Sequence, residues 1–280
     1  MRKRGNQIAQ HIEREIFFHV GIAKTGTTFL QDRVFPEFEG IWYIGRNRYH
    51  RAIKIIRRSR APRILVSYEF DLHFEKAMEK FGAVFPRTTP VIVLRHHASY
   101  IASQYRRFIK NGFRGSFRDF FDMENDKGLF KKKDLEFMRF IRILEETFRP
   151  DPVVLFYDDL SRDPERFIID LAKRIGATVD IQRINLKKKH TSFTEKQLRA
   201  VRWVGRFINL KVVESCPTRL IRFFCRLPKN MVRYPVLWLS KYLPDSLFSS
   251  EPLIPPEELE KIREYYKEDW QACRRYAEGR

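Results

Sequence analysis

Short apolar runs alternate with segments of helical pattern from residue 16 to residue 176. Five runs have the length of strands, at 16–20, 41–44, 63–67, 90–94 and 152–157. Helical patterns follow them at 27–36, 49–58, 74–85, 98–110, 135–148 and 164–176. Because strands that alternate with helices build parallel sheets, the pattern predicts an α/β fold with a mainly parallel central sheet flanked by helices.

The pattern changes beyond about residue 194, where helices rich in arginine and aromatic residues are predicted. Proline is expected to interrupt these helices, at Pro217, Pro228, Pro235, Pro244 and Pro252. A last helix is predicted at 256–277, with an acidic start and a basic end that suit the helix dipole. The chain should therefore comprise a basic tail at 1–14, an α/β core at 15–210 and a helical C-terminal extension at 211–280 packed on the core.

Two interpretations of the C-terminal extension are open. Basic and bulky apolar residues are interleaved in the segment FFCRLPKNMVRYPVLWLSKYLPDSLF at 223–248. Such a segment can form a helical subdomain that packs into the core, and the proline breaks favour this interpretation. It can also form a surface that rests on an anionic membrane or grips a glycolipid, because Arg, Lys, Trp and Tyr suit a headgroup region.

The composition indicates a globular protein with anionic partners. Of the 280 residues, 43% are hydrophobic, and 55 Lys and Arg face 35 Asp and Glu, for a net charge of +20. This excess of positive charge fits nucleic acid, an acidic glycan, a phospholipid surface or a phosphorylated cofactor. The three cysteines are widely spaced and odd in number, so we expect free thiols in a reducing compartment. The N-terminus lacks the apolar core of a secretory signal, which predicts a cytoplasmic protein.

The segment IFFHVGIAKTGTTFL at 16–30 carries the clearest chemistry. A strand ends at Gly21, a short loop follows, and a helix is predicted to begin at Thr27. Small residues allow such a loop to approach an anion, and the free N–H groups at a helix start face it. Lys24 adds a positive charge, the threonines add hydroxyl groups, and Gly26 permits conformations that other residues resist. The segment therefore predicts a phosphate-binding loop.

The order of residues in this loop distinguishes two families of phosphate-binding proteins. In the nucleoside-triphosphate P-loop the lysine directly follows the second glycine, whereas here Lys24 precedes Gly26. With the order K-T-G-T-T after a hydrophobic strand, the loop resembles the 5′-phosphosulfate loop of sulfotransferases that use 3′-phosphoadenosine 5′-phosphosulfate (PAPS), including bacterial and glycan sulfotransferases. The resemblance covers about 16–209 and implies their P-loop-like fold.

The resemblance implies that the loop binds PAPS and that no metal is needed. The implied donor-binding residues of the loop are Ala23, Lys24, Thr25, Gly26, Thr27 and Thr28. Lys24 would meet the bridging oxygen of the leaving phosphate. Backbone amides from Gly26 to Thr28, with the hydroxyl groups of Thr27 and Thr28, would hold the 5′-phosphate.

Two later segments resemble the parts of the family that bind the rest of the nucleotide. Arg95 at a strand end and Ser103 eight residues on have the spacing of the residues that bind the 3′-phosphate. Many relatives carry proline two residues after the arginine, where this chain has His97. The loop NLKKKHTS at 185–192 resembles the loop that covers the nucleotide, and its candidate ligands are Lys188, Lys189, His190 and Ser192. The segment YDDL at 157–160 resembles a family element to which we assign a structural role.

The base that accepts the proton of the acceptor hydroxyl has two candidates. Glu69, just after the third predicted strand, resembles the catalytic glutamate of several glycan sulfotransferases. His19, in the strand before the loop, is the rival, although a lone histidine in an apolar strand is more often a packed residue.

The predicted function is sulfuryl transfer from PAPS to an acceptor hydroxyl on a carbohydrate or glycolipid. Glycan sulfotransferases of eukaryotes usually follow a membrane anchor, so an unanchored chain suggests a bacterial enzyme or an isolated catalytic domain. Nucleic acid is not an expected partner. A nucleoside-triphosphate-dependent kinase that uses Lys24 and a non-catalytic protein that binds polyanions are the alternatives.

Overall fold

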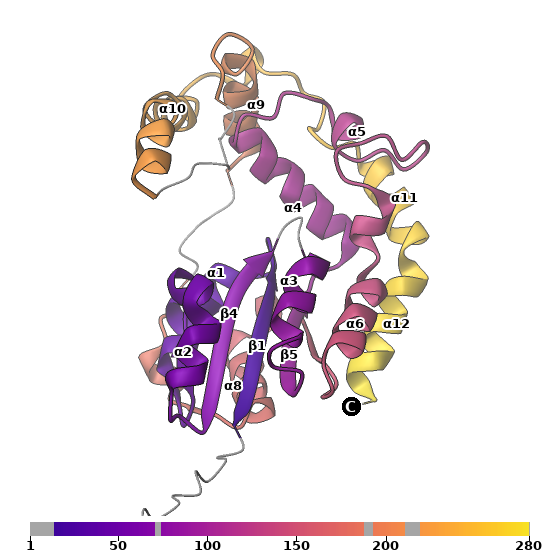
Figure 1. The fold of residues 1–280 in the computed structure, drawn as a ribbon. Coiled ribbons are helices and arrows are strands. Elements are labelled where there is room, and N and C mark those ends of the chain that lie inside the picture. Colours follow the sequence, from indigo (N-terminus) through magenta and orange to yellow (C-terminus); the bar gives the residue numbers. More distant parts are fainter. Residues whose placement is uncertain (1–13, 71–73, 188–192, 211–218, 280) are drawn as a thin grey trace, which may run out of the picture. The chain divides into compact units, whose positions relative to one another are not determined.

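A computed structural model describes residues 14–70, 74–187, 193–210 and 219–279, with the backbone alone described for 219–226 (Figure 1). The chain forms two compact units. The first comprises Met1–Leu94 and Arg139–Leu186, and the second comprises Arg95–Met138 and Lys187–Arg280. The predicted α/β core of 15–210 thus has parts in both units.

The first unit is built on a five-stranded sheet in the order β3-β4-β1-β5-β6. Its strands are β1 (Glu15–Ile22), β3 (Trp42–Ile44), β4 (Arg63–Phe70), β5 (Thr88–Leu94) and β6 (Val153–Phe156). Every neighbouring pair is parallel, so the five predicted strands and the parallel sheet are confirmed. A second sheet pairs β2 (Phe38–Glu39) with β7 (Thr178–Val179). Two residues are too short a run for a sequence pattern to show.

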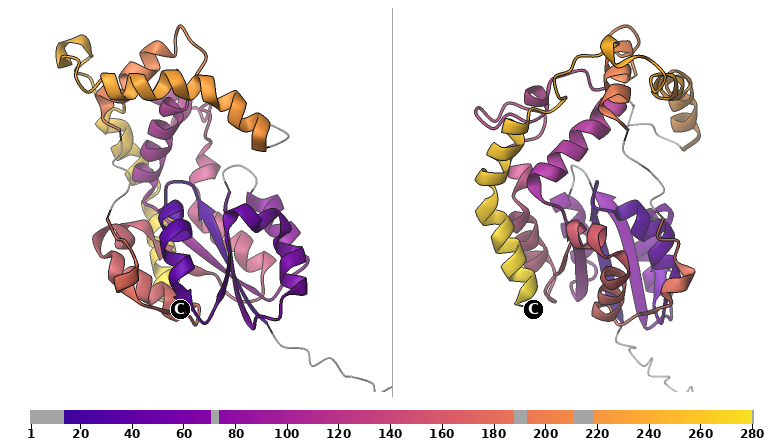
Figure 2. Two further views of the ribbon diagram at one scale, coloured as in Figure 1. Left: turned by 90° about the vertical axis from the view of Figure 1, so that its left-hand side faces the viewer. Right: turned by 180° about the vertical axis from the view of Figure 1, so that it is seen from behind.

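Helices cover both faces of the central sheet (Figure 2). Successive residues of β1 point to opposite faces, because side chains alternate along a strand. Phe17 packs into a core with Phe35 and Leu171, which belong to η2 (Phe35–Glu37) and α8 (Pro164–Arg174). Phe18 contacts Tyr49 and Phe81, from η3 (Arg46–Arg51) and α3 (Phe74–Gly82). Burial on both faces explains why the strands are continuous apolar runs.

The remaining helices of the first unit complete these two layers. They are α2 (Ala52–Arg58), α6 (Phe137–Thr147) and α7 (Tyr157–Arg162). In place of the single helix predicted from Thr27 to Pro36, the structure has α1 (Thr27–Phe29), the π-helix η1 (Leu30–Val34) and the 3₁₀-helix η2. A π-turn widens the helix and is common beside functional sites.

The second unit is helical. Its elements are α4 (His97–Lys110), α5 (Phe117–Phe120), η4 (Lys132–Leu135), α9 (Glu195–Val204), α10 (Arg219–Leu239), η6 (Asp245–Leu247), α11 (Pro256–Tyr265) and α12 (Lys267–Glu278). Helix α4 contacts both α9 and α11. The last two helices correspond to the predicted helix at 256–277, which is divided at Tyr266.

The prediction that Pro228 and Pro235 break the helix is wrong, because α10 runs through both. A proline inside a helix removes one hydrogen bond and frees the carbonyl four residues earlier. Both prolines are exposed, and so is Met231, whose carbonyl Pro235 frees. Water can therefore hydrogen-bond that carbonyl. Pro244 and Pro252 do lie outside helices.

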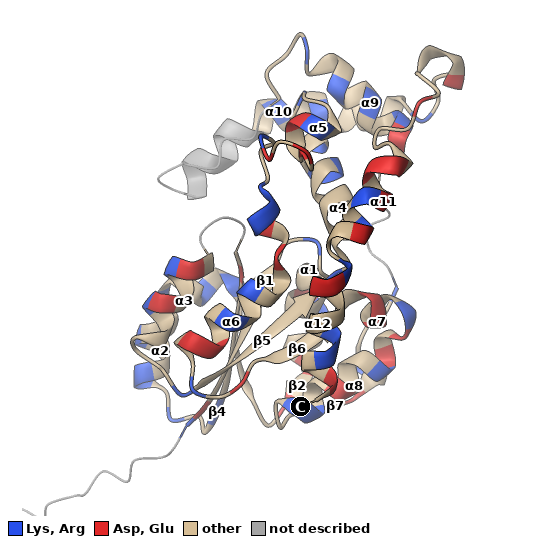
Figure 3. Cartoon of the chain, turned by 90° about the vertical axis from the view of Figure 1, so that its right-hand side faces the viewer, with Lys and Arg blue, Asp and Glu red and all other residues tan. Residues whose placement is uncertain are grey.

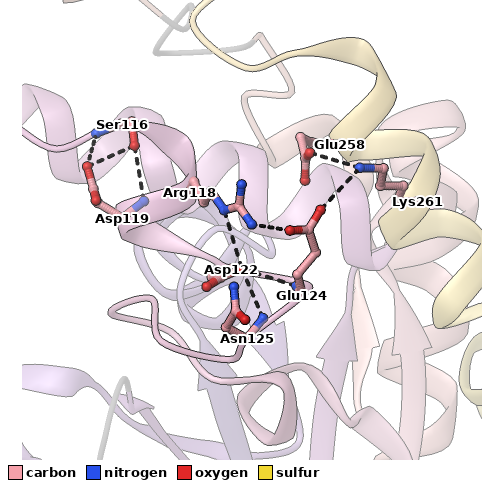
Figure 4. A network of polar contacts seen from close by, with 8 residues as sticks. All are labelled: Ser116, Arg118, Asp119, Asp122, Glu124, Asn125, Glu258 and Lys261. Atoms are coloured by element: carbon pink, nitrogen blue, oxygen red, sulfur yellow. Dashed lines mark hydrogen bonds and ion pairs between the residues drawn. The ribbon is translucent and has the colours of Figure 1, made fainter.

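An ion pair joins the segment after α4 to helix α11 (Figure 4). Ser116 and Asp119 form a capping box at the start of α5. Arg118 pairs with Glu124, and Glu124 in turn lies 3.8 Å from Lys261 of α11. In the part of the chain described, no helix has the length and apolar character needed to cross a membrane.

Candidate functional site

The loop after β1 exposes one lysine and one threonine. Lys24 is exposed and adopts a left-handed backbone conformation with φ 69°. Thr25 and Thr27 are buried, and each hydroxyl donates to the carbonyl of Ile22, at 2.8 Å and 3.0 Å. Thr28 is exposed. Two buried hydroxyl groups therefore hold the loop closed on the strand end, while Lys24 and Thr28 face outward.

Two glycines allow this loop to pack closely. A Cβ on Gly21 would lie 2.7 Å from Thr27 Cγ2. Gly26 has φ +83°, and a Cβ there would lie 2.7 Å from Leu160 Cδ2 and 3.5 Å from Tyr157 Cδ2. Both side chains belong to α7, so the YDDL segment supports the loop from behind. This contact agrees with the structural role assigned to that segment from the sequence.

A buried polar cluster lies beneath the loop. His19 Nδ1 is 2.8 Å from Ser67 Oγ, its register partner on β4, and Gln31 Nε2 donates to the same oxygen at 2.9 Å. Tyr43 donates from its hydroxyl to the main-chain oxygen of Gln31 at 3.1 Å. His19 Nε2 and Gln31 Oε1 have no hydrogen-bond partner among the residues that the structure describes. The cluster ties β1, β4 and η1 together.

His19 is neutral at physiological pH. Its side chain is fully buried, with its ring centroid 5.0 Å from that of Phe35. Burial lowers the pKa of His19 to about 3. The candidate base is thus a packed histidine in the interior, where an acceptor hydroxyl would have to enter the core to reach it.

Glu69 lies at the edge of the sheet where the loop begins. It is a residue of β4, which continues to Phe70, and so does not follow the strand as predicted. Its register partner on β1 is Gly21, and its side chain is half-buried. Because residues two apart share a face of a strand, Glu69 lies on the same face as Ser67 and the cluster. The fold therefore positions a carboxylate beside the lysine loop.

Arg95 and Ser103 belong to the second unit. Arg95 follows the last residue of β5 and donates from Nε to Ser99 Oγ at 2.8 Å. Ser99 and Ser103 lie one turn apart on α4 and therefore share a face of this helix, whereas Arg95 lies just before the helix begins. Ser99 is not among the predicted site residues, and its hydrogen bond to Arg95 depends on how the chain turns between β5 and α4.

The other predicted donor ligands belong to the loop at 185–192 and to the start of the lysine loop. Lys188, Lys189, His190 and Ser192 lie outside the residues that the structure describes. Ala23 is buried at the base of the loop. Within the described ranges, no group of three or more His, Cys, Asp or Glu could hold a metal ion.

Comparison with solved structures assigns the architecture. The chain matches the crystal structure of a sulfotransferase from Alicyclobacillus acidocaldarius with a TM-score of 0.50 and 16% sequence identity, over 69% of this chain and 92% of that chain. The chain has the sulfotransferase fold. The resemblance inferred from K-T-G-T-T is therefore confirmed at the level of the fold. An identity this low leaves the reaction to be inferred from the residues.

Two weaker matches are also sulfotransferase domains. One comes from the curacin biosynthetic pathway, with a TM-score of 0.40 and 12% identity over 91% of this chain and 98% of that chain. The other belongs to the olefin synthase of Synechococcus PCC 7002, with a TM-score of 0.36 and 12% identity over 83% of this chain and 97% of that chain. No family model and no curated protein matches the chain.

Proposed function

We propose that this chain transfers a sulfuryl group from PAPS to a hydroxyl group of a carbohydrate or glycolipid. The observation that carries the proposal is the exposed Lys24, held in a left-handed conformation at the carboxyl end of β1 within a sulfotransferase fold. In parallel α/β sheets, ligands bind beyond the carboxyl ends of the strands. A lysine presented at that edge suits a phosphosulfate.

The shape of the loop fits the 5′ end of this donor. Gly26 lets the main chain turn at φ +83° and pack closely against Leu160 of α7, which supports the loop from behind. Thr28 adds an exposed hydroxyl donor, while Thr25 and Thr27 hold the turn through Ile22. We assign 5′-phosphate binding to the loop amides and Thr28, and loop positioning to the two buried threonines.

The chemistry follows from charge development in an in-line displacement. PAPS supplies the sulfuryl group, and adenosine 3′,5′-bisphosphate leaves as the acceptor oxygen forms its bond to sulfur. Lys24 neutralises the negative charge that grows on the departing phosphate oxygen. Glu69 accepts the proton of the acceptor hydroxyl, and its register position beside Gly21 supports this role over that of the buried His19.

Arg95 is the proposed ligand of the 3′-phosphate. A guanidinium group can bind a phosphate through two parallel hydrogen bonds. Ser99 orients this arginine at 2.8 Å, and Ser103 adds a hydroxyl one turn further along α4. The role of the 188–192 segment toward the nucleotide stays a prediction.

The acceptor is inferred from charge. A net charge of +20 favours an anionic molecule, and a carboxylate base suits a hydroxyl acceptor. A sulfated or uronic-acid glycan, or a glycolipid with an acidic headgroup, combines both features.

A thermal-shift measurement separates the proposal from its alternatives. A ligand that binds only the folded state raises the free energy of unfolding by about 2.7 kcal/mol when its concentration is a hundred times its Kd. The melting temperature rises accordingly. We expect adenosine 3′,5′-bisphosphate to stabilise the protein, and Arg95→Ala to weaken this effect. Stabilisation by Mg²⁺-ATP alone would support a kinase. Salt-sensitive binding of heparin without any response to the nucleotide would support a polyanion-binding protein.

The transfer itself is tested with PAPS labelled in the sulfuryl group and a panel of acceptors. We expect Lys24→Ala to lower kcat by about 10²–10³-fold, the usual effect of removing a group that stabilises transition-state charge. Lys54→Ala is the matched control, because Lys54 is an exposed lysine of α2. Equal rates in the two variants would refute the role of Lys24.

A further inference from the structure

The outward face of α10 is apolar from Leu227 to Trp238. Five large residues lie on it at helical spacing: Leu227, Met231, Tyr234 and Trp238, followed by Tyr242 in the turn after the helix. Their exposed fractions are 41%, 69%, 53%, 57% and 71%. We call these five residues the α10 apolar face. Single exposed apolar residues are ordinary, but a continuous row marks an interaction site.

Contacts on the opposite side of α10 fix which face points outward. Leu237 packs with Val201 and Leu210 in a small core. Arg233 is 4% exposed and donates to the main-chain oxygen of Leu210 at 2.7 Å. Gln197 of α9 donates to the main-chain oxygen of Leu237 at 2.6 Å. The helix therefore buries Arg233 and exposes Trp238. These contacts fix the rotation of α10 about its axis, and this rotation exposes the apolar face.

The segment of chain that carries the face is basic. The sequence contains no acidic residue from 215 to 244, a stretch that includes all of α10. Figure 3 shows the described part of this helix in blue and tan, without red. Lys241 is exposed between Trp238 and Tyr242. Apolar residues and positive charge thus occur together, with nothing to repel a negatively charged partner within that stretch.

The end of α9 has the same composition. Trp203 and Phe207 are 60% and 73% exposed, with ring centroids 5.1 Å apart, and Arg206 between them is exposed. Helices α9 and α10 contact each other. The second unit therefore carries two neighbouring elements on which aromatic and basic side chains alternate at the surface.

We propose that the α10 apolar face docks the protein on the surface of a bilayer that contains anionic phospholipid. Tyr and Trp favour the boundary between headgroups and acyl chains, because each has an apolar ring and a polar atom. Leu227 and Met231 add apolar area that can enter that boundary, and Lys241 can pair with lipid phosphate. The inference rests on this face alone and holds whether or not the chain transfers sulfate.

Charge argues against a second copy of the chain as the occupant. In a two-fold dimer the same patch meets itself. Such pairing would place the basic stretch of 227–244 against its own copy with no acidic residue of that stretch to balance it. Anionic lipid supplies the missing negative charge, so the membrane is the partner that fits both properties of the surface.

Sedimentation with vesicles tests the proposal. We expect the full chain to pellet with vesicles of equal parts phosphatidylcholine and phosphatidylglycerol, to bind vesicles of phosphatidylcholine more weakly, and to dissociate as salt rises. The double variant Met231→Ser, Trp238→Ser should lose at least about tenfold in partitioning, because it removes two large side chains from the apolar boundary. The matched control is Tyr265→Ser, since Tyr265 on α11 is also an exposed tyrosine, at 55%.

Circular dichroism and light scattering measure the folding and the oligomeric state of the same proteins. Circular dichroism of the double variant should match that of the wild type, because both replaced side chains are exposed. A blue shift of tryptophan fluorescence on adding anionic vesicles, reduced in Trp238→Phe, supports insertion of the face. The proposal is overturned if the wild-type protein stays in the supernatant at low salt, if the double variant and Tyr265→Ser bind equally, or if light scattering shows a dimer that the double variant abolishes.

Discussion

Gly21 on β1 and Glu69 on β4 are register partners on adjacent parallel strands. Neighbouring strands lie about 4.8 Å apart, so this pairing sets the carboxylate-bearing residue beside a strand position three residues before Lys24. The link is made by the backbone of the sheet rather than by a flexible side chain. The position of Glu69 relative to Gly21 therefore does not depend on the conformation of the loop that carries Lys24.

Replacing Glu69 with glutamine should lower kcat and leave nucleotide binding intact. Loss of a general base typically costs about 10²–10⁴-fold in rate, whereas the nucleotide contacts proposed above do not involve this side chain. The measurements are labelled sulfuryl transfer and the thermal shift with adenosine 3′,5′-bisphosphate. Glu75→Gln is the control, because Glu75 on α3 is a carboxylate that pairs with Arg139. Retained activity in Glu69→Gln together with lost activity in His19→Asn would assign the base to His19.

Replacing Gly26 with alanine should destabilise the protein more than replacing Gly40. Both glycines have similar backbone conformations, with φ +83° and φ +78°. A Cβ on Gly40 meets nothing within 4 Å, so Gly40→Ala should cost only the left-handed strain of about 1–2 kcal/mol. At Gly26 the Cβ also meets Leu160, and overpacking adds about 1–3 kcal/mol. Urea unfolding of both variants measures the difference, and equal losses would show that Leu160 yields without cost.

The strands and the lysine loop could be predicted from the sequence because their signals are local. A continuous apolar run bounded by polar residues marks a strand buried on both faces, as in 90–94 of β5. The order of Lys24 and Gly26, which indicates the kind of loop, is likewise contained in a few neighbouring residues. These features depend little on what lies elsewhere in the chain.

Features that depend on distant contacts could not be predicted. Nothing near Thr27 indicates that its hydroxyl is used by Ile22, because the turn that joins them forms only in the folded loop. The π-turn at Gln31 accompanies a hydrogen bond to Ser67, which is far away in sequence. Helix α10 continues through Pro235 with its prolines on the exposed side, and exposure is a property of the tertiary structure.

The buried His19 should make the protein less stable in acid. Its pKa is about 3 in the folded state, against an ordinary value of 6.5 for a histidine in the unfolded chain. Below pH 6.5 the unfolded chain therefore binds a proton at His19 that the folded chain does not bind. The free energy of unfolding falls as the pH falls. Between pH 6.5 and about pH 5 this group should lower the free energy of unfolding by about 2 kcal/mol.

The variant His19→Asn isolates this effect, since asparagine can keep a hydrogen bond to Ser67 and does not titrate. Urea unfolding at the two pH values should show a smaller acid loss in the variant, by the same amount. An identical pH dependence in both proteins would mean that His19 gains a partner for its proton or is accessible to water.

Asp269 should be a principal anchor of the C-terminal helices. Its Oδ2 lies 2.9 Å from His97 Nε2 and accepts from the main-chain N–H of Phe137 at 3.0 Å, while Oδ1 accepts from Met138 at 3.2 Å. The His97 ring is stacked on both sides, with centroids 4.6 Å from Tyr266 and 4.3 Å from Phe137. Burial lowers the pKa of His97 although Asp269 opposes the shift. Because an ionised carboxylate only accepts hydrogen bonds, the imidazole donates from Nε2.

Asp269→Ala should therefore cost about 2–4 kcal/mol, because it leaves a fully buried imidazole N–H unsatisfied and removes two backbone caps. Glu268→Ala, which removes an exposed carboxylate from the adjacent position of α12, should change stability by less than about 0.5 kcal/mol. Chemical denaturation of both variants gives the comparison. The double variant His97→Phe, Asp269→Ala should recover part of the loss, since replacing both polar partners with apolar groups removes the unsatisfied donor. Equal losses of stability in Asp269→Ala and Glu268→Ala would show that aromatic neighbours alone hold His97. In that case His97 would need no hydrogen-bond partner from α12.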